Sequence, residues 1–410
     1  MSYQFLKNDF GKNILLRNNV PLMAFIRDDS KLTKLVMVNN FSSYDYDVDV
    51  ISLTAKMLLE GTKKYSYEQL SDMIEFYGAE VKAYAKRDAN IFSITVLNEY
   101  FHNLFDIFND IFVESLFSPE RLENVKMKEI EKLNIENSEN STRVVKRLRQ
   151  ALYNSQKPYG DVRTQERLKT VTVDDIKSCF SKLWINNCML FVTGPSNTIE
   201  YIKDNVSDVF CCDSDNAPVE VSIGPSQEQI IKMRDNTCQQ VNIALGSITI
   251  PVIHEDYLKL LCTISFLGGG YLGSRLMQAI REKKGLTYGI SANISSQRYS
   301  NFLCIRTAAK KEFKDEILYT IDHEIERLKN DLVAPEELDN FKKYFCGEII
   351  SLFTNVFSPV NHLFTTRILN MKDSYYYDLF MTVEQLTAED IKDCAVKYLD
   401  FKKLTQVFIE

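Results

Sequence analysis

Residues 172–184 read TVDDIKSCFSKLW, and this stretch recurs in altered form at residues 387–399 as TAEDIKDCAVKYL. Both copies open with a threonine that is followed by acidic residues, which is the pattern of a helix N-cap and its first turn. Each copy precedes a short apolar run, MLFVTG at 189–194 or LTQVFI at 404–409, which predicts a buried strand. Each copy therefore predicts one amphipathic helix followed by one strand.

A second repeated pair lies at nearly the same offset, SPERLENVK at 118–126 and APEELDNFK at 334–342. In both segments proline stands at the expected first helical position, where its missing N–H costs nothing. Two pairs at one spacing predict two homologous halves of roughly 200 residues. We expect domains over residues 1–212 and 226–410, joined by the polar linker DSDNAPVEVSIGP at 213–225.

Strand-like runs alternate with long amphipathic helices in each half, at residues 35–41, 90–97, 242–250 and 302–308. This ordering predicts an α+β fold in which each half is a mostly antiparallel sheet with helices packed on one face.

Composition restricts the class of protein. The 410 residues carry a net charge of -7, and the 49 basic and 56 acidic residues are mixed without a basic stripe, which argues against a nucleic-acid-binding protein. The nine cysteines form no CxxC pair, which favours free thiols in a reducing compartment. The start shows no apolar signal region and no apolar run approaches about 18 residues, so we expect a cytoplasmic protein without a membrane span.

Residues 268–289, GGGYLGSRLMQAIREKKGLTYG, raise the question of a phosphate-binding loop. The glycines are not followed by the Lys-Ser/Thr of a Walker A loop, and the preceding LKLLCTISFL has helical rather than strand periodicity, so a nucleotide site is not expected. Instead, Ser274 is expected to cap a helix that Gly285 ends. Arg281 then ends a helix and Tyr288 begins a strand; taken alone, they indicate a solvated arginine and a half-buried tyrosine.

The stretch GGGYLGSRLMQAIREKKGLTYGISA strongly resembles the C-terminal half of the pitrilysin/insulinase family of zinc peptidases. Residues 57–97 also resemble the family's segment after its metal-binding helix, and the resemblance extends over essentially the whole chain. It implies a two-domain chain that forms half of a clam shell. It also implies that Arg281 and Tyr288 contact substrate near the cleaved bond, and that the glycines form a tight turn with close backbone packing, at Gly268, Gly269 and Gly270.

The family's metal motif, HxxEH, is missing from this chain. The matching positions are Ser52, Ala55 and Lys56, so neither metal-binding histidine nor the general base is present. Glu129 matches the third-ligand position, and a single carboxylate predicts a structural role rather than a metal site. None of the four histidines lies three or four residues from another histidine or cysteine, so we expect no metal in this chain.

The resemblance implies a role beside a second chain. Some family members are pairs in which one chain carries HxxEH and zinc and the other supplies the Arg/Tyr pair. This sequence is similar to the second kind, which implies a heterodimer with a homologous zinc-binding subunit that takes unfolded or short peptides. Tyr288 would donate a hydrogen bond to the oxyanion, and Arg281 would hold a substrate carbonyl.

Two alternatives stay open at this level: a catalytically inactive scaffold, and a homodimer that binds peptides without cutting them. An independent enzyme that uses Lys56 as a base has no support in the sequence.

Overall fold

The computed structural model describes residues 11–16, 18–40, 46–212, 229–236 and 238–410. The expected linker at 213–225 lies outside these described residues. The chain divides into two compact units, which we call unit 1 and unit 2. Unit 1 comprises 1–134, 163–219 and 353–368, and unit 2 comprises 135–162, 220–352 and 369–410.

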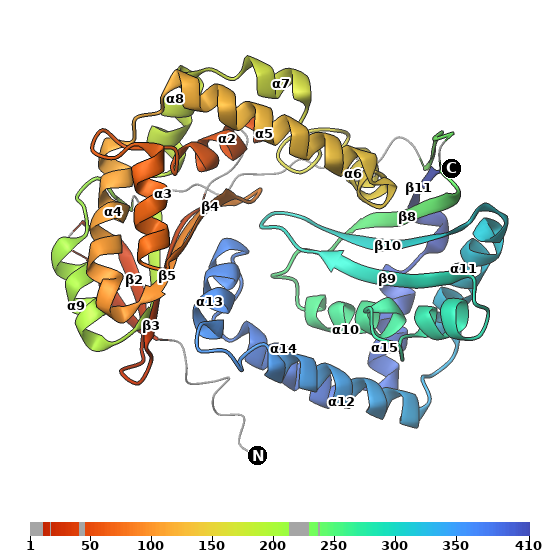
Figure 1. Cartoon of the computed structure of the whole chain (residues 1–410). Coiled ribbons are helices and arrows are strands. Elements are labelled where there is room, and N and C mark those ends of the chain that lie inside the picture. The colour runs from red at the N-terminus through yellow and green to blue at the C-terminus, as the bar shows by residue number, and fades with distance from the viewer. Residues whose placement is uncertain (1–10, 17, 41–45, 213–228, 237) are drawn as a thin grey trace. The chain divides into compact units, whose positions relative to one another are not determined.

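Unit 1 alternates strands with helices (Figure 1). Its strands are β1 (Lys12–Leu15), β2 (Pro21–Ile26), β3 (Leu32–Asn40), β4 (Glu80–Ala85), β5 (Ala89–Leu97) and β6 (Cys188–Gly194). Its helices are α2 (Val48–Met57), α3 (Tyr67–Phe76), η1 (Asn98–Tyr100), α4 (Phe101–Glu114), most of α5 (Pro119–Ser138), α7 (Gln165–Thr170), α8 (Val173–Leu183), α9 (Ser196–Asn205) and α13 (Ser358–Ile368).

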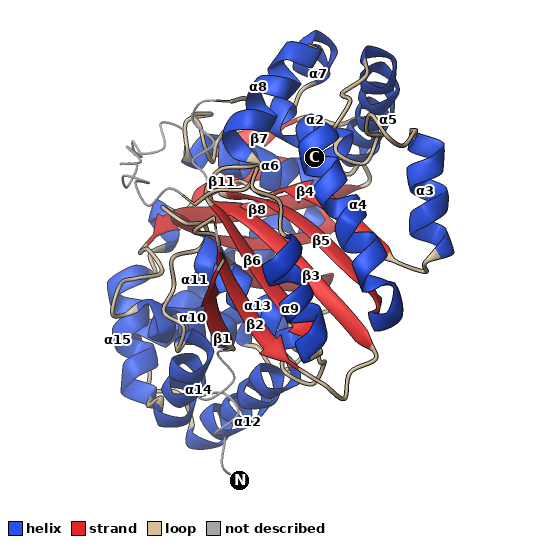
Figure 2. Cartoon of the chain, turned by 90° about the vertical axis from the view of Figure 1, so that its left-hand side faces the viewer, coloured by secondary structure: helices blue, strands red, loops and turns tan. Residues whose placement is uncertain are grey.

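The described strands of unit 1 form one sheet in the order β1-β2-β6-β3-β5-β4. Only β2 and β6 pair in parallel, and the other neighbours are antiparallel. Helices α4 and α9 pack on one face of this sheet, as Figure 2 shows. Every second strand side chain points to that face, and the apolar side of each helix packs against it in a shared core. Trp184, the single tryptophan of the chain, is fully buried in that core.

Unit 2 also combines the strands of one sheet with helices. Its strands are β7 (Ile230–Met233), β8 (Gln240–Thr249), β9 (Thr287–Ser295), β10 (Asn301–Lys310) and β11 (Thr405–Ile409). Its helices are α6 (Asn140–Leu152), α10 (Tyr257–Gly268), η2 (Met277–Glu282), η3 (Lys311–Phe313), α11 (Lys314–Asn330), α12 (Pro335–Ser351), α14 (Tyr375–Gln385), α15 (Ala388–Tyr398) and η4 (Phe401–Lys403).

The described strands of unit 2 follow the order β7-β11-β8-β10-β9, so β9 is an edge strand. All neighbours are antiparallel except β7 and β11. Helix α10 packs against β9 and against α14 and α15. The predicted α+β class, with mostly antiparallel sheets, is confirmed in both units.

Each unit also takes one helix from the other half of the sequence. Helix α6 packs on β8 and β11 of unit 2, and α13 packs on β3 and β6 of unit 1. Val144 and Leu148 of α6 are buried against unit 2 strand residues, and Phe364 of α13 meets Phe191 of β6 edge to face at a ring-centroid distance of 6.4 Å. The compact units are therefore not two uninterrupted halves of the chain.

The repeated segments begin as their sequences predict. The side chains of Thr172 and Thr387 each accept a hydrogen bond from the backbone N–H of the aspartate three residues later, and that aspartate bonds back to the threonine N–H. Among the described residues no helix combines the length and the apolar character needed to cross a membrane.

Candidate functional site

The positions predicted to match the family's metal motif, Ser52, Ala55 and Lys56, lie on α2 of unit 1. Ala55 is buried at 1% exposure, and Ser52 and Lys56 are half-buried. Lys56 borders an open cavity of about 390 Å³, and Glu129 of α5 lies on the same cavity. Lys56 and Glu129 thus lie at one cavity, and the side chains at the predicted motif positions are a hydroxyl, a methyl group and an ammonium.

A second cation, the guanidinium of Arg163, contacts both Glu129 and Ser52. Its Nη1 lies 2.7 Å from Oε2 of Glu129 and 3.4 Å from Oγ of Ser52. The exposed fractions of the Arg163 and Glu129 side chains are 17% and 9%, so the ion pair is largely shielded from water. The guanidinium therefore links Glu129 of α5 to Ser52 of α2.

A second ion pair joins the same segment to α2. Nε of Arg167 lies 2.8 Å from Oδ2 of Asp49, whose side chain is fully buried. The other carboxylate oxygen of Asp49 accepts a bond from the backbone N–H of Thr164 at 3.3 Å. The start of α7 is thereby fixed against α2, next to Arg163.

Zinc does not fit this arrangement. Zinc sites in proteins use imidazole, thiolate or carboxylate ligands in sets of three or more. Here the two carboxylates that line the cavity, those of Glu60 and Glu129, are each already paired with a guanidinium, that of Arg121 and that of Arg163. Within the described ranges no group of three or more His, Cys, Asp or Glu side chains is placed to hold a metal ion.

Arg281 lies in unit 2 on η2, where the helix widens into a π-turn. The backbone N–H of Lys283 bonds to the carbonyl of Gln278 at 3.0 Å, five residues back. The Arg281 side chain is 39% exposed, and its Nε lies 3.5 Å from a carboxylate oxygen of Glu282. Gly285, with φ of +63°, ends the turn, as expected from the sequence.

The expected cap at Ser274 is not observed. Its hydroxyl is buried and has no hydrogen-bond partner within the described part of the chain. Its backbone carbonyl accepts a bond from the N–H of Gln278 at 2.9 Å, and its backbone N–H donates to the carbonyl of Tyr271 at 3.1 Å. The helix begins without a side-chain cap because Ser274 is enclosed by packing rather than placed at a solvated helix end.

Tyr288 lies in a β-bulge at the start of β9. Thr307 of β10 pairs with Ile290 and Ala309 pairs with Thr287, so two residues of β9, Tyr288 and Gly289, oppose one residue of β10. The Thr287 hydroxyl lies 2.9 Å from that of Thr307, and Thr307 donates to the Gly289 carbonyl at 2.8 Å. These bonds fix the bulge, which directs the Tyr288 side chain to solvent at 90% exposure.

Gly268 and Gly269 are closely packed, and Gly270 has a left-handed backbone conformation. A Cβ on Gly268, the last residue of α10, would lie 2.8 Å from the Cβ of Ala292 on β9. A Cβ on Gly269 would lie 2.6 Å from the carbonyl oxygen of Ser265, and Gly270 has φ of +86°. The turn after α10 can therefore reach η2 only with glycine at these positions.

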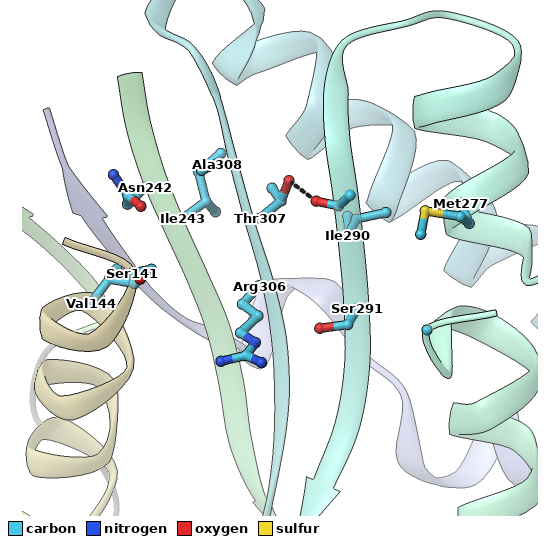
Figure 3. Close-up of a pocket in the computed structure, with 12 residues that line it drawn as sticks. Ser141, Val144, Asn242, Ile243, Met277, Ile290, Ser291, Arg306, Thr307 and Ala308 are labelled. Carbon is cyan, nitrogen blue, oxygen red and sulfur yellow. Dashed lines mark hydrogen bonds between the residues drawn. The ribbon is translucent and has the colours of Figure 1, made fainter. Parts of the chain in front are cut away.

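An open cavity of about 330 Å³ lies along β9 and across the sheet of unit 2 (Figure 3). It is bordered by Gly289 and Ser291 of β9, by Met277 of η2 and by Asn242 of β8. Arg306 of β10 is the single charged residue among the described residues that line it. Sequence reasoning missed Arg306 and Arg163, because neither belongs to a local motif.

Arg306 has no ion pair or hydrogen bond with any residue that the structure describes. Its cross-strand neighbours are Ala244 and Ser291, which are both uncharged. Burial raises the pKa of the Cys304 thiol to about 11, and the positive charge of Arg306 opposes that rise. No carboxylate occurs among the described residues that line the cavity with Arg306.

Two segments of the chain, one in each half of the sequence, match models of known protein families. Residues 52–162 match "Insulinase (Peptidase family M16)", and residues 170–345 match "Peptidase M16 inactive domain". The chain belongs to peptidase family M16, the insulinase family.

Its relatives differ in the activity that their names state. The chain is 24% identical over 310 residues, 72% of each chain, to "Uncharacterized zinc protease YmxG" of Bacillus subtilis. It is 20% identical over 356 residues to "Non-peptidase homolog YmxG" of Helicobacter pylori, covering 86% of this chain and 82% of the relative. The solved structure of a peptidase M16 inactive domain from Pseudomonas fluorescens has 21% identity and a TM-score of 0.85 and covers 97% of each chain.

The 410 residues contain no HxxEH sequence, and residues 170–345 match the family's domain that is described as inactive.

Proposed function

We propose that this chain is the non-metal subunit of a two-chain zinc endopeptidase, which supplies substrate contacts to a site completed by a homologous partner with HxxEH. The observation that carries the proposal is the exposure of Tyr288. A tyrosine that is 90% exposed contributes little packing, yet a bulge and two threonine side chains hold its backbone in place. This is the arrangement of a side chain positioned for a partner or substrate.

The residues of this chain have two roles in the proposed site. The Tyr288 hydroxyl, which has no hydrogen-bond partner within the described ranges, donates to the oxyanion that develops on the cleaved carbonyl. Arg281, at the other end of the turn that joins η2 to β9, donates to a neighbouring substrate carbonyl. The free edge of β9 accepts an unfolded or short peptide as an added strand. Metal chemistry and water activation belong to the partner.

The test begins with gentle affinity purification of the tagged chain, followed by mass spectrometry and zinc analysis. The proposal expects a co-eluting chain with HxxEH and about one zinc per pair. In that complex, Tyr288→Phe should lower peptide turnover by ~10²-fold, the size of effect seen when one oxyanion donor is lost. Tyr319→Phe is the matched control, because Tyr319 is also an exposed tyrosine of unit 2, at 67%, but lies on α11. Unchanged turnover with Tyr288→Phe would refute the oxyanion role.

The second candidate is a peptide-binding or scaffold protein without hydrolysis. The Arg163–Glu129 ion pair favours it, because it makes the former metal position a structural element. The name of the Helicobacter pylori relative, a non-peptidase homolog, agrees with this candidate. A chain that elutes only with itself and without zinc would support it and exclude the heterodimeric peptidase.

A further inference from the structure

The charge distribution on the face of the unit 2 sheet that α6 partly covers points to a specific ligand group. Side chains alternate between the two faces of a strand, so Arg306 shares its face with Cys304 and Ala308 of β10. Its direct cross-strand neighbours are Ala244 and Ser291, and no carboxylate occurs in the described lining of the cavity. An opposite charge directly across a strand pair stabilises an arginine on a sheet face, and neither Ala244 nor Ser291 supplies one.

The position of Arg306 relative to the sheet edge sets what it can reach. Arg306 lies on β10, one strand in from the free edge of β9, and its neighbour toward that edge is the small Ser291. A peptide added to β9 would lie roughly 9.5 Å from β10, two inter-strand spacings. In Figure 3 the Arg306 side chain points to the side of β8, away from β9. A rotamer that extends instead over the small Ser291 would span that gap together with a carboxylate-bearing side chain of the peptide.

We propose that Arg306 binds a carboxylate of the peptide that lies along β9. The carboxylate belongs to an acidic side chain next to Ser291 or to the C-terminus of the peptide, and in both cases the planar guanidinium bonds it through two donors. The cavity has room for this group, because it extends across β10 and along the edge of β9. This inference rests on the proposed function, since it assigns a preference for acidic peptides to the same surface.

The test measures peptide binding by fluorescence anisotropy, with the complex that co-purifies with the chain, or with the chain alone if it purifies alone. Three labelled, unstructured decapeptides are compared. The first has one central Glu and an amidated C-terminus, the second has Gln in its place, and the third has Gln and a free C-terminal carboxylate. The protein variants are Arg306→Gln and Arg306→Lys. The control is Arg234→Gln, which removes an exposed arginine next to β7, at the opposite edge of the sheet.

We expect the wild-type protein to bind a carboxylate-bearing peptide about 10-fold more tightly than the neutral one at low salt, and to lose much of this preference at high salt. Preference for the first peptide identifies an acidic side chain as the ligand, and preference for the third identifies the C-terminus. Arg306→Gln should abolish the preference, Arg306→Lys should retain part of it, and Arg234→Gln should leave it intact.

Two results overturn the inference alone: equal binding of all three peptides by the wild-type protein, or a preference that survives in Arg306→Gln. Failure to bind any peptide overturns the proposed function together with it. Arg306 is exposed, so its replacement is not expected to unfold the protein, and circular dichroism of each variant checks this.

Discussion

Replacing Arg163 by methionine tests whether the former metal position now stabilises unit 1. The substitution keeps most of the apolar side-chain length but removes the cation 2.7 Å from Glu129. Removing one partner of a buried ion pair costs about 3–5 kcal/mol, whereas exposed pairs contribute about 0–1 kcal/mol. The exposed fractions of 17% and 9% place this pair nearer the buried limit, so we expect the free energy of unfolding to fall by roughly 2–3 kcal/mol.

The assay is urea unfolding followed by tryptophan fluorescence. Trp184 is the single tryptophan and is fully buried in unit 1, so its emission reports on the unit that contains Arg163. The double variant Arg163→Met/Glu129→Gln should recover at least half of the loss, because it removes the uncompensated negative charge. The control is Lys203→Met on α9, also in unit 1, whose pair with Glu200 is 37% and 64% exposed. The reasoning is refuted if Arg163→Met stays within about 0.5 kcal/mol of the wild-type protein, which is the change expected for the control.

Two further predictions concern unit 2 and are measured by circular dichroism, because its described residues contain no tryptophan. Gly268→Ala should lower the free energy of unfolding by about 1–3 kcal/mol, because the added Cβ would collide with Ala292. The control is Gly347→Ala in α12, where an added Cβ meets nothing within 4 Å, and it should raise the free energy of unfolding by about 0.5–1 kcal/mol. Equal effects of the two substitutions would contradict the packing argument. For Asp256, a hydrogen bond from Lys397 lowers the pKa of the carboxyl below its usual value of 3.8, so its stabilising contribution is present above about pH 4 and is lost as the pH falls through the lowered pKa. Asp256→Asn should therefore be less stable than the wild-type protein at pH 7, with a difference that disappears toward pH 2, and a difference independent of pH would exclude this linkage.

Local sequence patterns predicted much of the fold. The Thr172 and Thr387 segments begin helices with the expected caps, and the apolar runs that follow them form β6 and β11. These features depend on residues within a few positions of one another, so their periodicity and capping chemistry are visible in the sequence. The predicted cap at Ser274 was wrong, because a serine before a helical pattern can also be buried without capping the helix.

The parts of the site that the sequence did not predict depend on contacts between distant residues. Arg163 meets Glu129 across 34 positions, and no local pattern marks an arginine that pairs in this way. The bulge that exposes Tyr288 arises from the register between two strands, and the isolation of Arg306 depends on its neighbours on β8 and β9. Such relations are set by tertiary pairing rather than by propensity.

The exchange of α6 and α13 has a consequence for how such a chain can arise and fold. The apolar stripe of α6, which includes Val144 and Leu148, is buried against strands from the other half of the sequence. Two duplicated copies that trade one helix each are a domain-swapped dimer, here fused into a single polypeptide. In a single polypeptide the exchange of α6 and α13 is intramolecular, so the packing of each helix on its unit does not depend on protein concentration. The cost is that neither half can bury its own exchanged helix, so folding requires both halves to be present.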